Sequence, residues 1–391
     1  MIAVLAPGQG AQSPGMLNPW LELPGAGDLV GELGEIAKLD LLRLGTTADA
    51  DEIKDTAVTQ PLIVALGVLA APHLGVDNGG AGASVFAGHS VGELTAATVA
   101  GALTASAAVG FAARRGFEMA AACALTPTGM SAVLGGDPNE VVAGIEAVGL
   151  VPANRNGAGQ IVAAGALDAL ADLAATPPAR ARVRPLPVAG AFHTSYMAPA
   201  EAALHDYAAI MDVADPHHIL LSNADGASVT TGPELVARLV AQVTRPVRWD
   251  LVLHTLRDLG VSAAIELPPA GTLTGIAKRE LPGIELLALK TPADLEAARR
   301  LIDSRPQHGH GEHTPDFQVV VAPAKGVFTR SELAEGAQVA RGTALGTVRT
   351  NRDEHSIVAG AAGILVEWLR HDGDIVAAGL PVARLHSGSE Q

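Results

Sequence analysis

Two short apolar runs in the first part of the chain predict buried strands, and a glycine-containing turn follows each of them. Residues 2–5 and 84–87 form short, mostly apolar runs of the kind found in parallel sheets. The turn after the second run leads into residues 94–113, which carry no charge and predict one long buried helix. Its length could span a bilayer, but its small residues and the interruptions at Gly101 and Gly110 favour a globular core.

Shorter elements follow between residues 130 and 186. Their pattern predicts strand, helix, strand, strand, helix and strand, with the first helix starting near Asp137 and Pro138. This order is typical of a ferredoxin-like subdomain. We therefore expect such a subdomain at residues 124–188, inserted in a large α/β domain with a parallel sheet that covers residues 1–302.

The last part of the chain has a different texture and contains an internal repeat. Residues 303–315 combine Pro, Gly and His without apolar periodicity, which indicates a linker. Residues 316–391 alternate Val-rich and Ile-rich runs with turns, which predicts a small all-β domain. Five positions recur at a constant offset of 37 residues, so two superposable halves are expected. They are Ala322, Gly326, Gly336, Val339 and Gly342, repeated as Ala359, Gly363, Gly373, Val376 and Gly379.

Composition and charge narrow the class of protein. An apolar share of 48% with only 3% aromatic residues suits helices packed on sheets and argues against disorder. The net charge of −15 argues against nucleic-acid binding and against binding to an anionic membrane surface. Cys123 is the single cysteine, so no internal disulfide can form, and residues 1–10 lack the basic region of a signal peptide. We expect a cytoplasmic enzyme.

The segment Gly88-His89-Ser90-Val91-Gly92 has the G-x-S-x-G form of the nucleophile elbow in hydrolase-like α/β domains. An elbow projects the serine hydroxyl at the start of a helix, where main-chain N–H groups favour an oxyanion. Serine is a weak nucleophile and needs a base, usually histidine. His89 would point away from the serine, whereas His193 stands in a glycine-containing turn at the return from the subdomain. Ser90 and His193 are therefore the candidate catalytic pair.

Motifs along residues 1–300 together resemble the malonyl-CoA:acyl-carrier-protein transacylases, and more distantly the acyltransferase domains of polyketide synthases. The matching segments occur in the family's order and spacing. They are Gly8-Gln9-Gly10-Ala11-Gln12, the elbow with Glu93, Arg115-Gly116, Asn154-x-Asn156, Gly190-Ala191-Phe192-His193, Gln242 before Pro246-Val247-Arg248-Trp249, and Glu266-Leu267 leading to Leu273-Thr274-Gly275.

The resemblance implies a mechanism. Ser90 attacks the thioester of malonyl-CoA, and the malonyl ester is then transferred to the phosphopantetheine thiol of an acyl carrier protein, in fatty-acid or polyketide synthesis. His193 acts as general base and then as acid. The side-chain amide of Gln242 orients the histidine ring, and the main-chain N–H groups of Gln9 and Val91 form the oxyanion hole. No metal or other cofactor is implied.

The same resemblance implies how the substrate is selected. Arg115 places a guanidinium against the free carboxylate of malonate, a pair that acetyl-CoA cannot form. Asn156 belongs to the substrate site, and Phe192 fits a pocket closed against a 2-methyl branch. The neighbouring Arg114 is expected at the surface.

The C-terminal repeat resembles the biotinyl or lipoyl carrier domain, but it lacks the residue that is modified. The hairpin between its halves, residues 350–355, contains no lysine, and the only lysine of the domain is Lys325. We therefore expect an unmodified scaffold or a domain that docks a protein partner. Two other functions remain open for the chain, namely an acyl-thioester hydrolase with the same elbow and a non-catalytic assembly subunit.

Overall fold

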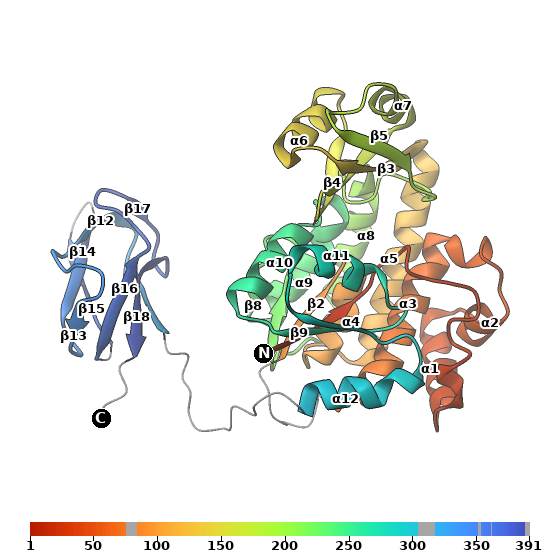
Figure 1. Cartoon of the computed structure of the whole chain (residues 1–391), viewed down its shortest axis with the longest axis horizontal. Helices are drawn as coiled ribbons and strands as arrows, with labels where there is room; N and C mark the ends of the chain where they lie inside the picture. The colour runs from red at the N-terminus through yellow and green to blue at the C-terminus, as the bar shows by residue number, and fades with distance from the viewer. Residues whose placement is uncertain (76–83, 304–316, 351–352, 361, 388–391) are drawn as a thin grey trace. The chain divides into compact units, whose positions relative to one another are not determined.

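The computed structural model describes residues 1–75, 84–303, 317–350, 353–360 and 362–387. The chain divides into two compact units, Met1–His308 and Gly309–Gln391. Each unit is described by itself below, with the elements labelled as in Figure 1.

A mainly parallel sheet forms the centre of the first unit (Figure 1). Its strand order is β10-β9-β1-β2-β7-β8, in which only the short β8 runs antiparallel to its neighbour. The strands are β1 (Ile2–Ala6), β2 (Ser84–Gly88), β7 (Ile219–Leu221), β8 (Ser228–Val229), β9 (Ala263–Glu266) and β10 (Glu285–Ala288). The predicted α/β fold with a parallel sheet is confirmed.

Helices cover both faces of this sheet because alternate residues of its strands point into two separate cores. Val4 and Phe86 belong to one core, while Leu5 and Val85 belong to the other. The larger core contains residues of α1 (Ala26–Ala37), α2 (Leu41–Thr46), α3 (Thr56–Ala70), α4 (Gly92–Val99), α5 (Ala105–Leu125), α8 (Ala198–Ala208), α9 (Gly232–Ala241) and α12 (Leu295–Asp303). The smaller core is covered by α10 (Trp249–Asp258) and α11 (Thr272–Glu280).

The prediction of one long helix over residues 94–113 is wrong. The segment forms most of α4 and the first part of α5, with a turn between them. Gly101 in this turn has a φ of 83°, and Thr104 caps α5 by accepting a hydrogen bond from Ala107 N. Both helices are buried in the same core, so the absence of charge carried no information about the turn.

Among the described residues, one helical stretch, Thr56–Leu74, is long and apolar enough to cross a membrane. It consists of α3 and a following 3-10 turn, and 78% of its most apolar window is buried inside the fold. Protein already covers this apolar surface, as in the core helix of a globular unit.

The expected ferredoxin-like subdomain is present as a four-stranded antiparallel sheet of order β4-β5-β3-β6. Its elements are β3 (Thr128–Gly135), α6 (Pro138–Ala147), β4 (Val151–Gly157), β5 (Gln160–Ala166), α7 (Leu167–Ala175) and β6 (Ala181–Pro185). Both helices lie on one side of the sheet (Figure 1) and pack on Val133 and Ile161. The opposite side, with Met130 and Val162, joins the larger core of the α/β unit.

The second unit is all β, as expected, and its strands follow the repeat. They are β11 (Phe317–Val321), β12 (Gly326–Arg330), β13 (Gln338–Val339), β14 (Ala344–Arg349), β15 (Glu354–Val358), β16 (Gly363–Trp368), β17 (Ile375–Val376) and β18 (Pro381–Ser387). Two antiparallel sheets have the orders β11-β18-β16-β13 and β15-β14-β12-β17. Each strand of the first half begins 37 residues before its counterpart in the second half. Replacing each strand of one sheet by its counterpart gives the strand order of the other sheet. The unit therefore has an internal pseudo-twofold arrangement.

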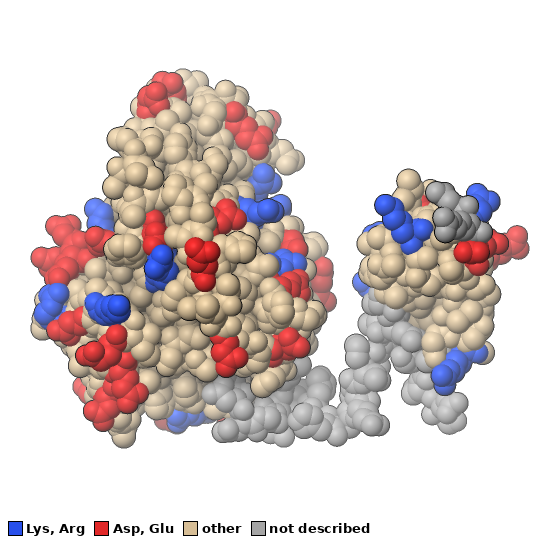
Figure 2. Space-filling view, turned by 180° about the vertical axis from the view of Figure 1, so that it is seen from behind, with Lys and Arg blue, Asp and Glu red and all other residues tan. Residues whose placement is uncertain are grey.

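Charged side chains of both signs are spread over the visible face of the α/β unit (Figure 2). Acidic groups lie among basic ones there. This face does not present the continuous basic surface that nucleic-acid binding favours.

Candidate active site

The predicted elbow joins β2 to α4 and holds Ser90 in a strained conformation. Ser90 has a φ of 54°, in the left-handed region that few non-glycine residues adopt. A Cβ atom on Gly88 would overlap the carbonyl group of Gly92, and one on Gly92 would overlap the carbonyl oxygen of Ala6. Both glycines of the motif are therefore required for the turn that exposes the serine.

Ser90 and His193 form a hydrogen-bonded pair. Ser90 Oγ lies 2.8 Å from His193 Nε2, and His193 Nδ1 lies 2.8 Å from the main-chain carbonyl oxygen of Gln242. The carbonyl can only accept, so Nδ1 carries the proton and Nε2 is left free to accept the serine proton. Burial, together with the nearby Arg115, lowers the pKa of His193 to about 3. The imidazole is thus neutral at neutral pH, as a general base must be.

The expectation that the side-chain amide of Gln242 orients His193 is wrong, because the main-chain carbonyl of the same residue does so. Gln242 begins a 3-10 turn directly after α9, where helix carbonyls lack their usual partners and remain able to accept. The side chain has other contacts. Its Nε2 donates to Glu93 and to Ser90 O, and its Oε1 accepts from Arg115.

Arg115 lies beside the catalytic pair and is buried, with only 2% of its surface exposed. Its Nη1 donates to Gln60 Oε1 at 2.7 Å, and its Nη2 donates to Ser90 Oγ at 3.1 Å and to Gln242 Oε1 at 3.0 Å. Its Nε has no hydrogen-bond partner in the described part of the chain. Burial lowers the pKa of Arg115 to about 10, so the guanidinium stays charged at neutral pH. Arg114, as expected, is at the surface in an ion pair with Glu118.

A pocket of about 490 Å³ gives access to these groups. Ser90, His193 and Arg115 line it, together with the predicted Gln9, Asn156 and Phe192. The pocket lies between the α/β domain and the subdomain, since Met130 of β3 and Val162 of β5 also line it. Asn156 Oδ1 lies 2.8 Å from His89 Nε2, and the described hydrogen bonds of Ser90 Oγ are to His193 and Arg115, not to His89. Val91 is buried next to the serine and is not among the lining residues.

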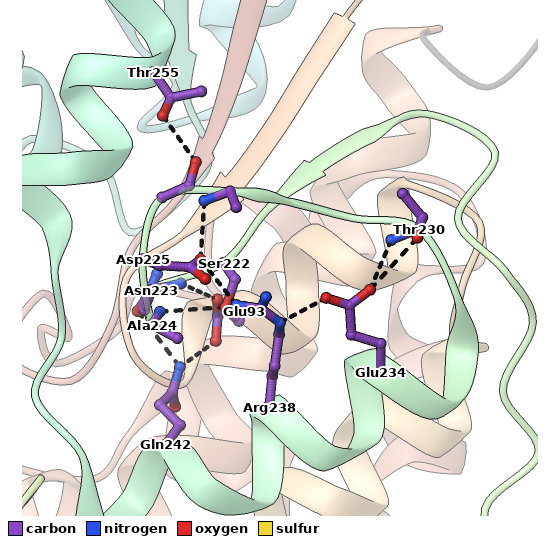
Figure 3. Close-up of polar contacts among 12 residues, drawn as sticks. Glu93, Ser222, Asn223, Ala224, Asp225, Thr230, Glu234, Arg238, Gln242 and Thr255 are labelled. Carbon is purple, nitrogen blue, oxygen red and sulfur yellow. Dashed lines mark hydrogen bonds and ion pairs between the residues drawn. The ribbon is translucent and has the colours of Figure 1, made fainter. Parts of the chain in front are cut away.

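Two polar residues behind the elbow were given no role from the sequence, Asn223 and Glu93 (Figure 3). Asn223 Oδ1 accepts from Ser90 N at 2.6 Å, and Asn223 Nδ2 donates to Gly88 O at 2.6 Å. Glu93 is buried at the start of α4. Glu93 directly follows the elbow, and Asn223 follows an apolar run that forms β7, the strand next to β2. Asn223 could have been found from its position at the carboxyl end of a strand next to β2, where α/β sheets place functional residues.

Comparison with known proteins gives a consistent result. Residues 5–291 match the family described as "Acyl transferase domain". The chain is 58% identical over 302 residues to the malonyl CoA-acyl carrier protein transacylase of Mycobacterium tuberculosis, across 77% of this chain and 100% of that protein.

Solved structures are similar over the same part of the chain. The crystal structure of MCAT from Mycobacterium tuberculosis has a TM-score of 0.74 at 57% identity, and covers 76% of this chain and 99% of that one. A complex of a type II PKS acyl-carrier protein with its malonyl-transacylase has a TM-score of 0.71 at 27% identity, and the match covers 78% of this chain and 99% of that one. The family match ends at residue 291, so the all-β unit lies outside it.

Proposed function

The chain belongs to the family of malonyl CoA-acyl carrier protein transacylases, and on this basis we propose that it transfers malonyl groups from coenzyme A to acyl carrier protein. One observation carries the proposal. The hydroxyl of Ser90 lies between a neutral imidazole and a buried guanidinium, at 2.8 Å from His193 Nε2 and 3.1 Å from Arg115 Nη2. The first group activates the serine, and the second recognises an acid.

The first half-reaction loads the enzyme. Ser90 Oγ forms a bond to the thioester carbon of malonyl-CoA while its proton passes to His193 Nε2. The main-chain N–H groups of Gln9 and Val91 stabilise the oxyanion. Neither N–H has a hydrogen-bond acceptor among the described residues, which supports this role. The C–S bond then breaks, and the leaving thiolate takes the proton from Nε2, so that the malonyl-Ser90 ester remains.

The second half-reaction removes the malonyl group from the enzyme. The phosphopantetheine thiol of the carrier protein attacks the ester carbon, and His193 takes the thiol proton. The C–O bond breaks and Ser90 regains its proton from the imidazolium. Both steps exchange one acyl bond for another without any change of oxidation state, so no redox cofactor is needed. The carrier-bound malonyl group then serves chain elongation in fatty-acid synthesis, and we place the reaction in the cytoplasm.

Arg115 makes the site selective for malonyl. Its Nε–H is buried without an acceptor among the described residues, and the N–H directed at Ser90 Oγ is released when the serine is acylated. A malonyl carboxylate supplies acceptors for both, whereas an acetyl group supplies none. Phe192 and Asn156 line the same pocket, and we assign them to acyl-group fit and to substrate contact.

Intact-mass measurement tests this function against the two alternatives. Incubation with malonyl-CoA should add one malonyl group to the protein, and Ser90→Ala should abolish the addition. Holo acyl carrier protein should then remove the group and gain it. Free malonate released at the same rate without carrier protein would indicate a hydrolase, and no covalent addition would indicate an assembly subunit.

For the all-β unit we propose an unmodified relative of biotinyl and lipoyl carrier domains that docks a protein partner. The exchange of strands between two sheets at a 37-residue offset supports the resemblance. The hairpin between its halves joins β14 to β15, and residues 351–352 of it lie outside the described part. Lys325 lies between β11 and β12, away from that hairpin in sequence. Mass analysis should find neither biotin nor lipoate on this unit.

We also propose the domain boundaries expected from the sequence. They are residues 1–302 for the acyltransferase domain with an inserted subdomain at 124–188, 303–315 for the linker and 316–391 for the all-β unit. Limited proteolysis should cleave first within residues 303–315.

A further inference from the structure

Glu93 is buried in the first turn of α4, with 4% of its surface exposed. Both of its carboxylate oxygens accept hydrogen bonds. Oε1 accepts from Asn223 N at 2.5 Å, and Oε2 accepts from Gln242 Nε2 (Figure 3). The mechanism proposed above gives this carboxylate no role.

The contact with Glu93 determines which way the Gln242 amide points. When Glu93 is ionised its carboxylate can only accept, so the amide then turns its NH₂ group toward Glu93. Its oxygen then faces the opposite side, where it accepts from Arg115 Nη2 at 3.0 Å. Gln60 supplies the matching amide oxygen to Nη1 at 2.7 Å. These two oxygens hold the plane of the guanidinium beside Ser90.

We propose that Glu93 is a positioning residue for recognition of the malonyl carboxylate, acting through the Gln242 amide on Arg115. This inference rests on the proposed function, because it names what aims the cation of that site. Arg115 donates to Gln60, Ser90 and Gln242 and not to Glu93 among the described contacts, so the guanidinium remains able to pair with substrate.

The charged groups around Glu93 fit this role. Arg115 of α5 and Arg238 of α9 are the cations that act on it electrostatically. Arg238 pairs with Asp225 at 2.8 Å and with Glu234 at 2.9 Å, so two other carboxylates already hold it (Figure 3). Within the described structure, the hydrogen-bond partners of Arg115 are neutral, namely a hydroxyl and two amides. The malonyl carboxylate is therefore the anion left for Arg115.

The charge state of Glu93 gives the proposal a second readout. Burial raises the pKa of Glu93 to about 8, while the main-chain N–H of Asn223 and the charge of Arg115 oppose that rise. N–H donors face both oxygens, an arrangement that suits the ionised form. A proton on Glu93 removes one of these acceptors and weakens the aim of Arg115. The KM for malonyl-CoA should therefore rise as the pH falls through this pKa.

Glu93→Gln tests the proposal with nearly unchanged size. Asn223 N still needs an acceptor, so the oxygen of the new amide takes that place and its NH₂ group faces Gln242. Gln242 must then reverse its amide, which turns an NH₂ group against the donors of Arg115. The contacts of Asn223 with Ser90 N and Gly88 O do not depend on this reversal. The substitution thus disturbs the aim of Arg115 and takes the Gln242 donor from Ser90 O, while the Asn223 contacts that hold the elbow remain.

Steady-state loading of Ser90 from malonyl-CoA and from acetyl-CoA is measured above the pKa of Glu93. Comparison of the two substrates separates an effect on the aim of Arg115 from an effect on the elbow. We expect the KM for malonyl-CoA to rise about 10- to 100-fold in Glu93→Gln, from loss of a hydrogen bond to a charged group. Loading of acetyl, which does not pair with Arg115, should fall far less. The variant should also lose the rise in malonyl KM that the wild type shows on acidification. Glu201→Gln is the control, because Glu201 accepts from Thr244 Oγ1 and has no hydrogen bond to Glu93, Gln242 or Arg115 in the described structure.

A double-mutant cycle shows whether Glu93 acts through Gln242. Gln242→Leu removes the amide but keeps the main-chain carbonyl that holds His193. The double variant Glu93→Gln with Gln242→Leu should be no worse than Gln242→Leu alone.

Four outcomes would overturn the proposal. They are additive losses in the cycle, an unchanged malonyl KM in Glu93→Gln, equal losses with acetyl-CoA, and the same pH dependence of malonyl KM in Glu93→Gln and wild type. Should Glu93→Gln fail to fold, an unchanged malonyl-to-acetyl ratio in Gln242→Leu would overturn it as well. Failure of the wild-type protein to load malonyl would instead refute the proposed function.

Discussion

Replacing Arg115 by alanine removes the only buried cation that contacts Ser90 among the described residues. A malonyl carboxylate held by two charge-assisted hydrogen bonds gains about 1.5–3 kcal/mol from each, or roughly 3–6 kcal/mol in total. We therefore expect kcat/KM for malonyl-CoA to fall by roughly 10²- to 10⁴-fold. Acetyl-CoA forms neither bond, so its loading should change far less and the preference for malonyl should disappear.

The same substitution affects stability. Gln60 Oε1 and Gln242 Oε1 lose their shared donor, and each buried oxygen left without a partner costs about 1–3 kcal/mol. The melting temperature should fall, so loading must be measured well below it. Arg114→Ala is the control, because Arg114 is about half exposed and forms a surface ion pair with Glu118 that is worth at most about 1 kcal/mol.

The assay is the ratio of malonyl to acetyl ester on Ser90, measured by intact mass at matched coenzyme A thioester concentrations. A ratio compares two substrates on the same folded molecules, so partial unfolding cancels. An Arg115→Ala protein that still prefers malonyl as strongly as the wild type would show that another group recognises the carboxylate.

Three further outcomes are expected. Burial lowers the pKa of His193 to about 3 in the folded protein, from 6.5 in the unfolded chain. Between these two pH values the unfolded chain therefore binds the proton more tightly than the folded protein does. This contribution to stability is complete above pH 6.5 and is lost at about 1.4 kcal/mol per pH unit as the pH falls below it, so thermal melts of His193→Asn should depend less on pH in that window. Gly88→Ala should destabilise the protein by about 1–3 kcal/mol or more, because its methyl group overlaps the Gly92 carbonyl, and a denaturant titration with unchanged stability would contradict this. A chain ending at Asp303 should load malonyl on Ser90 at the wild-type rate, since the family match ends at residue 291, and a slower rate in the same mass assay would give the all-β unit a part in loading.

The sequence was most informative where a local pattern determines a local structure. Gly88, Ser90 and Gly92 lie within five residues, and their spacing predicts the turn that the structure shows. The 37-residue repeat likewise predicted two equivalent halves, because each half carries the same turn glycines. The long helix over residues 94–113 was wrong because hydrophobicity reports burial and does not report where a buried helix ends.

Contacts between distant positions were not accessible in the same way. Glu93 and Gln242 are 149 residues apart, and Asn223 and Ser90 are 133 apart. Each pairing depends on how α9 and the segment after β7 pack behind the elbow, which no local pattern encodes. The error at Gln242 has the same cause. The prediction named the correct residue but the wrong group, because only the fold shows that its main-chain carbonyl faces His193.

The strand pairing of the all-β unit has a consequence for its chain ends. Phe317 of β11 pairs with His386 of β18, and Glu354 of β15 pairs with Arg349 of β14 in the corresponding register. The ends of this unit are thus neighbours, at the place that mirrors the β14–β15 hairpin. A circular permutant that joins residues 387 and 317 through a short loop and opens the chain at that hairpin should keep the same strand layout.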